Sequence, residues 1–287
     1  MKKILLIISV LLLTGCSLQS DNLNGSTIYV TNYPIKYLVE TLYKSTETDE
    51  TYGTIKSIYP NDVDTSKYEL TDKLIKEYSQ AGMFVYNGLS NEKNIAKKFI
   101  NNNRNILIMD VSYGLSTKNA IEELWLSPNN YLMLAKNVKD TFKDYLTNKT
   151  IISDVETNYA NFAETMSLLD ADLRSIGNQA KTNNTNTIVV TKSTYKFLES
   201  YGFIIVNLED PGYQTEDGQK TIKHNFDNGK YRTLITDVND ESELVKSLVE
   251  NNKAKKIELN TMTVGITDDN YIETMQEFIN NLQASTN

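Results

Sequence analysis

A single long helix is the feature that most constrains how this chain can fold. Within residues 153–179, apolar side chains recur at alternating steps of four and three, which places them on one stripe of a helix. A capping box formed by Ser153 and Glu156 predicts its start, and Gly177 followed by Asn178 predicts its end. No similar heptads occur elsewhere, so we expect the helix to pack against its own chain rather than in a coiled coil. The stripe consists of Val155, Tyr159, Phe162, Met166, Leu169, Leu173 and Ile176.

Short β-branched runs alternate with helical patterns on both sides of this helix. The order of strands and helices predicts parallel sheets covered by helices, hence an α/β fold of two (β/α) lobes over residues 27–150 and 186–287. Turn residues and polar residues between Leu208 and Thr233 predict a loop. The expected strands are 27–31, 54–58, 83–86, 106–110, 187–191, 204–208, 233–236 and 256–259, and the other expected helices are 34–43, 71–80, 91–101, 128–146, 193–201, 241–251 and 271–282.

Composition bounds the class of protein. The chain has 287 residues, of which 40% are hydrophobic, so it can build two cores of ordinary domain size. Its formal net charge of -8 disfavours a nucleic-acid partner, because such a surface repels phosphates.

The start of the chain has the pattern of an exported lipoprotein. Two lysines precede an apolar run over residues 4–13, which is too short for a stable membrane anchor but suits a signal peptide. The run ends in Leu-Thr-Gly-Cys, and Cys16 is the only cysteine. This resembles the bacterial lipobox, which implies removal of a signal peptide (residues 1–15) and acylation of Cys16. Residues 16–26 then form a lipidated tether outside the cytoplasmic membrane.

Two open α/β lobes create a crevice where the carboxyl ends of both sets of strands meet, and ligands of such folds bind there. We therefore expect binding residues just past the strand ends, at residues 62–66, 191–194 and 260–262, and in the loop that enters the helix at Pro128.

These crevice segments carry a family resemblance. The segment 59–70, Tyr-Pro-Asn-Asp-Val-Asp-Thr-Ser-Lys-Tyr-Glu-Leu, resembles a signature of the zinc and manganese ABC-transporter solute-binding lipoproteins. Residues 81–89 are similar to the segment that follows it in that family. Leu-Trp-Leu-Ser-Pro-Asn-Asn at 124–130 resembles the family's tryptophan-leucine-aspartate-proline motif, and residues 193–203 resemble the first helix of its second lobe.

The resemblance implies a metal-type periplasmic binding protein, with two lobes joined by a single long rigid helix. It further implies a lipid-anchored protein that delivers zinc or manganese to an ABC permease in the membrane. The positions that match the family's metal ligands are Ser66, Glu123, Lys192 and Asn260.

The chemistry of these positions predicts lost or altered metal specificity. A hydroxyl and an amide oxygen are weak ligands without imidazole or thiolate beside them. The ammonium of Lys192 has no lone pair and repels a dication. The only histidine, His224, falls in the predicted polar loop.

Three hypotheses for the crevice remain open on the sequence. The ammonium of Lys192 pairs with Glu123 across the crevice and latches the lobes, or the two charges are solvated separately. Alternatively, Lys192 and Asn260 bind the carboxylate or phosphate of a small anionic solute.

Two other functional classes compete with solute binding. An enzyme is not expected, because the chain has neither a G-x-S-x-G motif nor a glycine-rich phosphate loop. The alternative is a non-transporting lipoprotein that uses the same fold as an adhesin or envelope interaction module.

Overall fold

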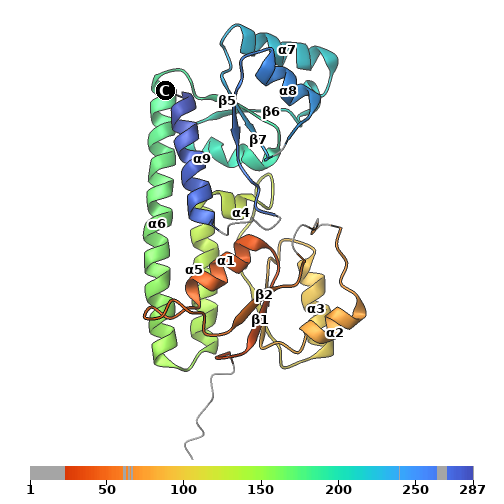
Figure 1. The fold of residues 1–287 in the computed structure, drawn as a ribbon, viewed down its shortest axis with the longest axis vertical. Coiled ribbons are helices and arrows are strands. Elements are labelled where there is room, and N and C mark those ends of the chain that lie inside the picture. The colour runs from red at the N-terminus through yellow and green to blue at the C-terminus, as the bar shows by residue number, and fades with distance from the viewer. Residues whose placement is uncertain are drawn as a thin grey trace, which may run out of the picture.

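Two lobes of the same architecture are stacked along one long helix (Figure 1). The computed structural model describes residues 23–60, 63, 65, 67–238, 240–263 and 270–286. Each lobe contains a parallel four-stranded sheet, with strand orders β2-β1-β3-β4 and β6-β5-β7-β8. The predicted α/β fold of two parallel-sheet lobes is therefore confirmed.

The first lobe places its sheet between two unequal layers. Helix α1 belongs to the large apolar core that also contains α5, whereas α2 and α3 close a smaller core around Phe84 and Phe99 on the other face. The elements are β1 (Thr27–Val30), α1 (Tyr33–Leu42), β2 (Thr54–Ser57), α2 (Asp72–Tyr78), β3 (Met83–Tyr86), α3 (Glu92–Asn102), β4 (Leu107–Asp110), α4 (Glu123–Leu126) and α5 (Pro128–Tyr145).

The second lobe corrects the loop predicted between Leu208 and Thr233. This stretch contains helix α7, which begins where the Thr215 side chain accepts from the Gly218 amide and which buries Ile222 and Phe226. Two apolar positions four residues apart were too few to reveal a helix in a polar stretch. The elements are β5 (Thr187–Val190), η2 (Ser193–Tyr201), β6 (Ile204–Asn207), η3 (Pro211–Tyr213), α7 (Glu216–Asp227), β7 (Thr233–Thr236), α8 (Glu243–Glu250), β8 (Lys255–Glu258) and α9 (Tyr271–Thr286).

The linking helix α6 (Lys149–Thr182) is longer than the stripe of apolar residues predicts. Its start is capped by Asn148, whose side chain accepts from the amides of Thr150 and Ile151, so the predicted capping box at Ser153 is wrong. Gly177 lies inside the helix rather than at its end. A Cβ there would lie 1.8 Å from the carbonyl oxygen of Tyr201, so glycine permits close approach of the second lobe.

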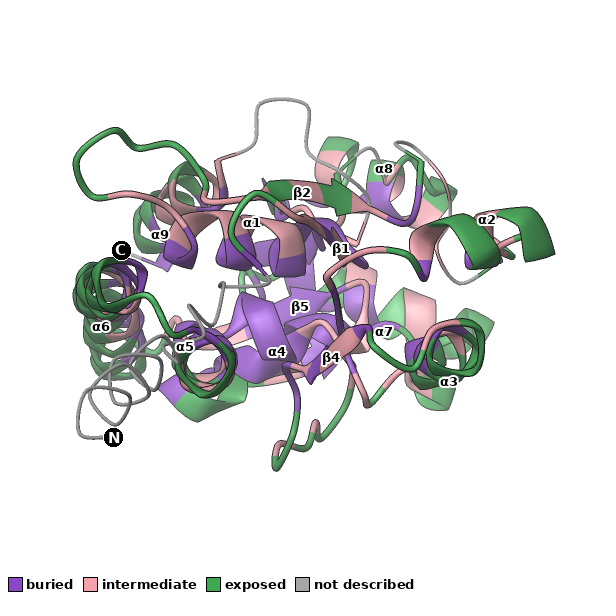
Figure 2. Ribbon diagram, turned by 90° about the horizontal axis from the view of Figure 1, so that it is seen from below, coloured by how far each residue is buried: buried purple, intermediate pink, exposed green. Residues whose placement is uncertain are grey.

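The apolar stripe of α6 joins the two lobes into one core. Val155, beside the first lobe, and Ile176, beside the second, belong to the same buried cluster. Figure 2 shows this burial at the centre of the molecule, with exposed residues on α2, α3 and the outer side of α6. The expectation that the helix packs against its own chain is therefore confirmed.

The chain packs against the first lobe before the end of the predicted tether (residues 16–26). Leu23, inside the predicted tether, is 1% exposed and belongs to the large core. None of the described helices combines the length and the apolar character needed to cross a bilayer.

A buried carboxyl group lies at the start of α3. Glu92 is 8% exposed, and its Oε2 accepts from the amide of Asn87 at 2.9 Å. Burial raises the pKa of the Glu92 carboxyl to about 7, and the nearby Asp110 adds to the effect.

We expect Glu92 to make stability depend on pH. In the unfolded chain this carboxyl has a pKa near 4.5, so between pH 4.5 and about 7 the folded chain binds more protons. The free energy of unfolding should therefore fall as pH rises through this window, by at most about 1.4 kcal/mol per pH unit, and level off above it. Chemical denaturation at about pH 5 and about pH 8 measures this difference. In Glu92→Gln, which retains an oxygen acceptor, the contribution should disappear, and an equal pH dependence in both proteins would contradict the assignment.

Candidate functional site

The short helix α4 is the part of the first lobe that reaches the second. All four of its residues are buried. The indole Nε1 of Trp125 donates to the carbonyl oxygen of Thr261 at 2.8 Å, and the carbonyl of Trp125 accepts from the Tyr271 hydroxyl at 2.6 Å. Trp125 thus binds both the loop after β8 and the start of α9, and it connects the first lobe to the second.

Two tyrosines extend this contact into the first lobe. The rings of Tyr131 and Tyr271 lie 4.5 Å apart, and the Tyr131 hydroxyl donates to the carbonyl oxygen of Pro34 at 2.6 Å. Burial holds the pKa of both phenols well above the ordinary value, so both remain hydrogen-bond donors. The two lobes are therefore joined by apolar packing and buried hydrogen bonds.

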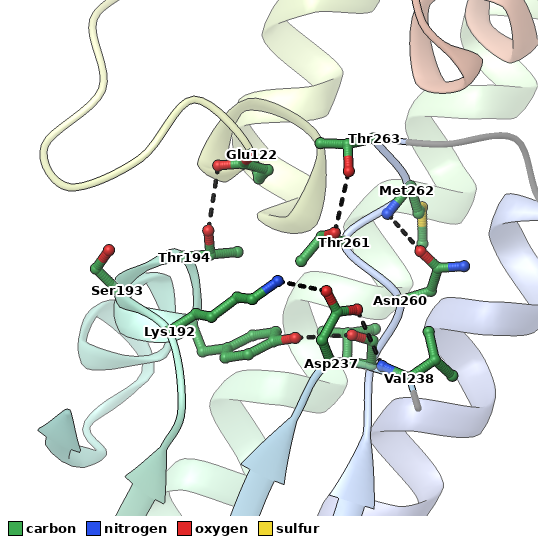
Figure 3. Close-up of polar contacts among 12 residues, drawn as sticks. Glu122, Lys192, Ser193, Thr194, Asp237, Val238, Asn260, Thr261, Met262 and Thr263 are labelled. Carbon is green, nitrogen blue, oxygen red and sulfur yellow. Dashed lines mark hydrogen bonds and ion pairs between the residues drawn. The ribbon is translucent and has the colours of Figure 1, made fainter. Parts of the chain in front are cut away.

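The second lobe contributes an ion pair at the carboxyl ends of its strands. Lys192 follows β5 and Asp237 follows β7, and these two strands are neighbours in the sheet. The Lys192 Nζ lies 2.5 Å from Oδ2 of Asp237 (Figure 3). Oδ1 of Asp237 accepts from the Val238 amide at 2.9 Å. Asp237 is thus held in place by its own backbone and neutralises the ammonium.

Glu123 turns away from this ion pair. It is 5% exposed, and its two oxygens accept from the Lys118 amide at 2.9 Å and from Asn119 Nδ2 at 2.6 Å. Of the three hypotheses for the crevice, the latch between Glu123 and Lys192 is therefore wrong, because each charge is bound inside its own lobe.

The neighbouring carboxylate, Glu122, is the one that faces the second lobe. Its Oε2 accepts from the Thr194 hydroxyl at 3.1 Å, directly above Lys192 in Figure 3. Glu122 was not predicted because Glu122 and Glu123 are adjacent at the start of a short helix, and the sequence does not show which of them faces the second lobe. Asp237 was not predicted because the sequence does not show that β7 lies beside β5.

The side chain of Asn260 is hydrogen-bonded within its own loop. Its Oδ1 accepts from the Met262 amide at 2.7 Å, and Met262 has a φ of 59°. The hydroxyls of Thr261 and Thr263 lie 3.3 Å apart beside it. The amide oxygen that would serve as a metal ligand is therefore already an acceptor for the backbone.

The remaining predicted residues do not join this group. Ser66 and Cys16 lie outside the described residues. His224 is exposed in the last turn of α7. Across the ranges described above, no three histidine, cysteine, aspartate or glutamate side chains converge as ligands for a metal ion.

A second polar space lies on the Glu123 side of α4. It is a cavity of about 390 Å³ with walls from both lobes and from α6. Its cations already have carboxylate partners, since Arg174 contacts Asp170 at 2.7 Å and Lys118 contacts Glu199 at 3.4 Å. Ligands of open α/β folds bind at the carboxyl ends of the strands, where Lys192 and Asp237 lie, so the group of Lys192, Asp237 and Glu122 is the candidate site. It offers donors and acceptors for a polar solute.

Comparisons with known proteins identify the family of this chain and its fold. Residues 28–285 match the family model described as ZnuA, zinc-uptake complex component A periplasmic. No curated protein sequence matches the chain.

Solved structures share the fold at low sequence identity. The metal-dependent lipoprotein YcdH from Bacillus subtilis has a TM-score of 0.74 and 18% identity, and the match covers 90% of this chain and 98% of that one. The Zn(II)-bound ZnuA-like domain of AdcA from Streptococcus pneumoniae has a TM-score of 0.71 and 18% identity, over 91% and 99% of the two chains. The laminin-binding protein Lbp of Streptococcus pyogenes has a TM-score of 0.69 and 13% identity, over 92% and 100%. The family match confirms the resemblance predicted from the sequence.

We expect Tyr271→Phe to loosen the junction between the lobes. The substitution removes the hydroxyl that binds the Trp125 carbonyl and leaves that buried acceptor unpaired, which costs about 1–3 kcal/mol of unfolding free energy. Urea denaturation measures the loss, with Tyr145→Phe, at a side chain 41% exposed, as the matched control. Equal stability of the two variants would show that the hydrogen bond does not hold the junction.

Proposed function

Because this chain belongs to the family of periplasmic component A proteins of zinc-uptake complexes, we propose that it is the extracytoplasmic solute-binding component of a metal-type ABC transporter. In this function the chain delivers its solute to an ABC permease in the membrane. The solute that it binds differs from the zinc or manganese of the family.

The observation that carries the altered specificity is the ion pair of Lys192 and Asp237. At the position that matches a metal ligand of the family, the chain has an ammonium 2.5 Å from a carboxylate. A dication entering the crevice would have to displace this cation from Asp237 or sit beside it, and both cost electrostatic free energy. The ammonium thus fills the electrostatic role of a metal ion without binding one.

The other matching positions support the same conclusion. Both oxygens of Glu123 are bound by Lys118 and Asn119, and the oxygen of Asn260 is bound by Met262. Each of these oxygens therefore already accepts a hydrogen bond that orients it within its own lobe. The Asn260 Nδ2 and the Lys192 ammonium remain suitable donors for the carboxylate or phosphate of a small anionic solute.

The proposal places the protein at the outer surface of the cytoplasmic membrane, anchored through lipid on Cys16. The support is the order of a basic start, an apolar run and the sole cysteine after Leu-Thr-Gly. Two or more acyl chains on one cysteine suffice for stable anchoring.

The interaction module is the competing function. One structural neighbour is named as a laminin-binding protein, although it shares only 13% of its residues with this chain. Failure of every small solute to bind would favour this function.

Thermal unfolding of the mature chain with zinc, manganese and a panel of small carboxylates and phosphates tests the specificity. A ligand at 100 times its Kd stabilises by about 2.7 kcal/mol, so a specific solute must raise Tm with its concentration. We expect no rise with micromolar zinc for the native chain. In Lys192→His the cation is replaced by an imidazole beside Asp237 and Glu122, and zinc should raise Tm.

The matched control for this titration is Lys97→His, which places an imidazole on the exposed face of α3. It should behave as the native chain does. A zinc-dependent rise in Tm for the native chain would contradict the altered specificity.

Labelling of expressing cells with radioactive palmitate tests the anchor. The native chain should carry label and sediment with membranes, whereas Cys16→Ser should lose both properties because no thiol remains to be acylated. Ser20→Ala, also near the start of the mature chain, should remain labelled. Label retained in Cys16→Ser would exclude the proposed anchor.

A further inference from the structure

Helix α3 and the turn after it form a strongly cationic surface on an acidic protein. Between Lys93 and Met109 the sequence contains four cations and no carboxylate, although the whole chain has a formal charge of -8. Lys93, Lys97, Lys98 and Arg104 are all exposed. Lys93 lies in the first turn of α3, so we call the other three residues, Lys97, Lys98 and Arg104, the basic end of the first lobe.

The cations of the basic end have no ion-pair partner among the described residues. The last turn of the adjacent helix α2 carries an exposed carboxylate, Glu77, next to another exposed cation, Lys76. The one carboxylate of α3, Glu92, is buried at the opposite end of the helix, and burial raises its pKa. The other exposed residues of α3 are mainly asparagines, which also donate hydrogen bonds.

The fold places the basic end beside the start of the described chain. The amide of Gly82 donates to the Thr27 carbonyl at 3.0 Å, and the Gly82 carbonyl accepts from the Leu107 amide at 3.1 Å. The start of β1 therefore lies close to the turn that contains Arg104. Since α3 connects two parallel strands, it runs opposite to them, and its last turns lie at this same end of the sheet (Figure 1).

The length of the intervening chain sets how far this surface can be from a membrane. Six residues separate Cys16 from the buried Leu23, so the seven steps between their Cα atoms span at most about 25 Å in any conformation. This step rests on the proposed lipid anchor. A lipid on Cys16 would keep the basic end close to the bilayer surface. The distance between them would then be a few Debye lengths at most, each about 8 Å, so the cations could be attracted by charged headgroups.

We propose that the basic end of the first lobe binds the anionic headgroups of the membrane to which the protein is anchored. Attraction between lysine or arginine and anionic lipid is additive near a charged surface. This attraction would orient the first lobe with α3 against the lipid. The orientation of the protein on the membrane would then depend on the basic end as well as on the tether.

Co-sedimentation with vesicles tests the proposal. The mature chain carrying Cys16→Ser is used, so that no acyl chain contributes to binding. The vesicles consist of phosphatidylcholine alone or mixed equally with phosphatidylglycerol. We expect binding to the anionic vesicles only, with loss of binding at about 0.5 M salt. The triple variant Lys97→Gln, Lys98→Gln, Arg104→Gln should bind roughly tenfold more weakly or worse.

The matched control removes three exposed cations elsewhere, as Lys181→Gln, Lys230→Gln, Arg232→Gln, at the end of α6 and in the second lobe. Its affinity for anionic vesicles should equal that of the parent chain, and circular dichroism checks that all variants fold. Equal losses in the two triple variants would overturn the proposal, as would equal binding to neutral vesicles or none to either. If the triple variant of the basic end bound vesicles as the parent chain does but lost binding to a purified permease, the surface would be a protein contact and the proposal would be overturned. The vesicle results depend neither on a solute nor on acylation, so they are independent of the proposed function.

Discussion

The shared apolar core along α6 is the constraint on which the rest of the structure depends. The stripe of α6 is covered by the first lobe near Val155 and by the second near Ile176, and Trp125 and Tyr271 fill the space between the lobes. Burial of this surface is the main free energy that holds the lobes together. The polar residues of the crevice are therefore not needed as a latch, and they are available to define a binding site.

Most of the fold followed from periodicity, and the errors have physical causes. The inner strands of the two sheets, β1, β3, β5 and β7, are short and largely buried apolar runs, which sequence patterns reveal well. The predicted start of α6 was wrong because the cap is Asn148 rather than Ser153. The predicted end was wrong because Gly177 serves the contact with Tyr201, and this role is visible only once the second lobe is in place. Helix α7 was missed because most of its surface faces water.

The site was harder to predict than the fold, because it depends on which strand ends become neighbours. Lys192 and Asp237 are 45 residues apart, and only the adjacency of β5 and β7 brings them together. The choice between Glu122 and Glu123 depends on the rotation of α4, which is one turn long and fixed by Trp125. The sequence singled out Lys192, but none of its three hypotheses for the crevice included Asp237 as the partner of the ammonium.

The ion pair of Lys192 and Asp237 affects the stability of the protein when no ligand is bound. A site built from several carboxylates repels itself when no metal is present, and such a protein gains stability by scavenging trace cations. Here the positive charge is covalently part of the chain, so the anionic group is compensated from the moment of folding. The contribution of Asp237 to the stability of the second lobe therefore does not depend on capture of a cation from solution.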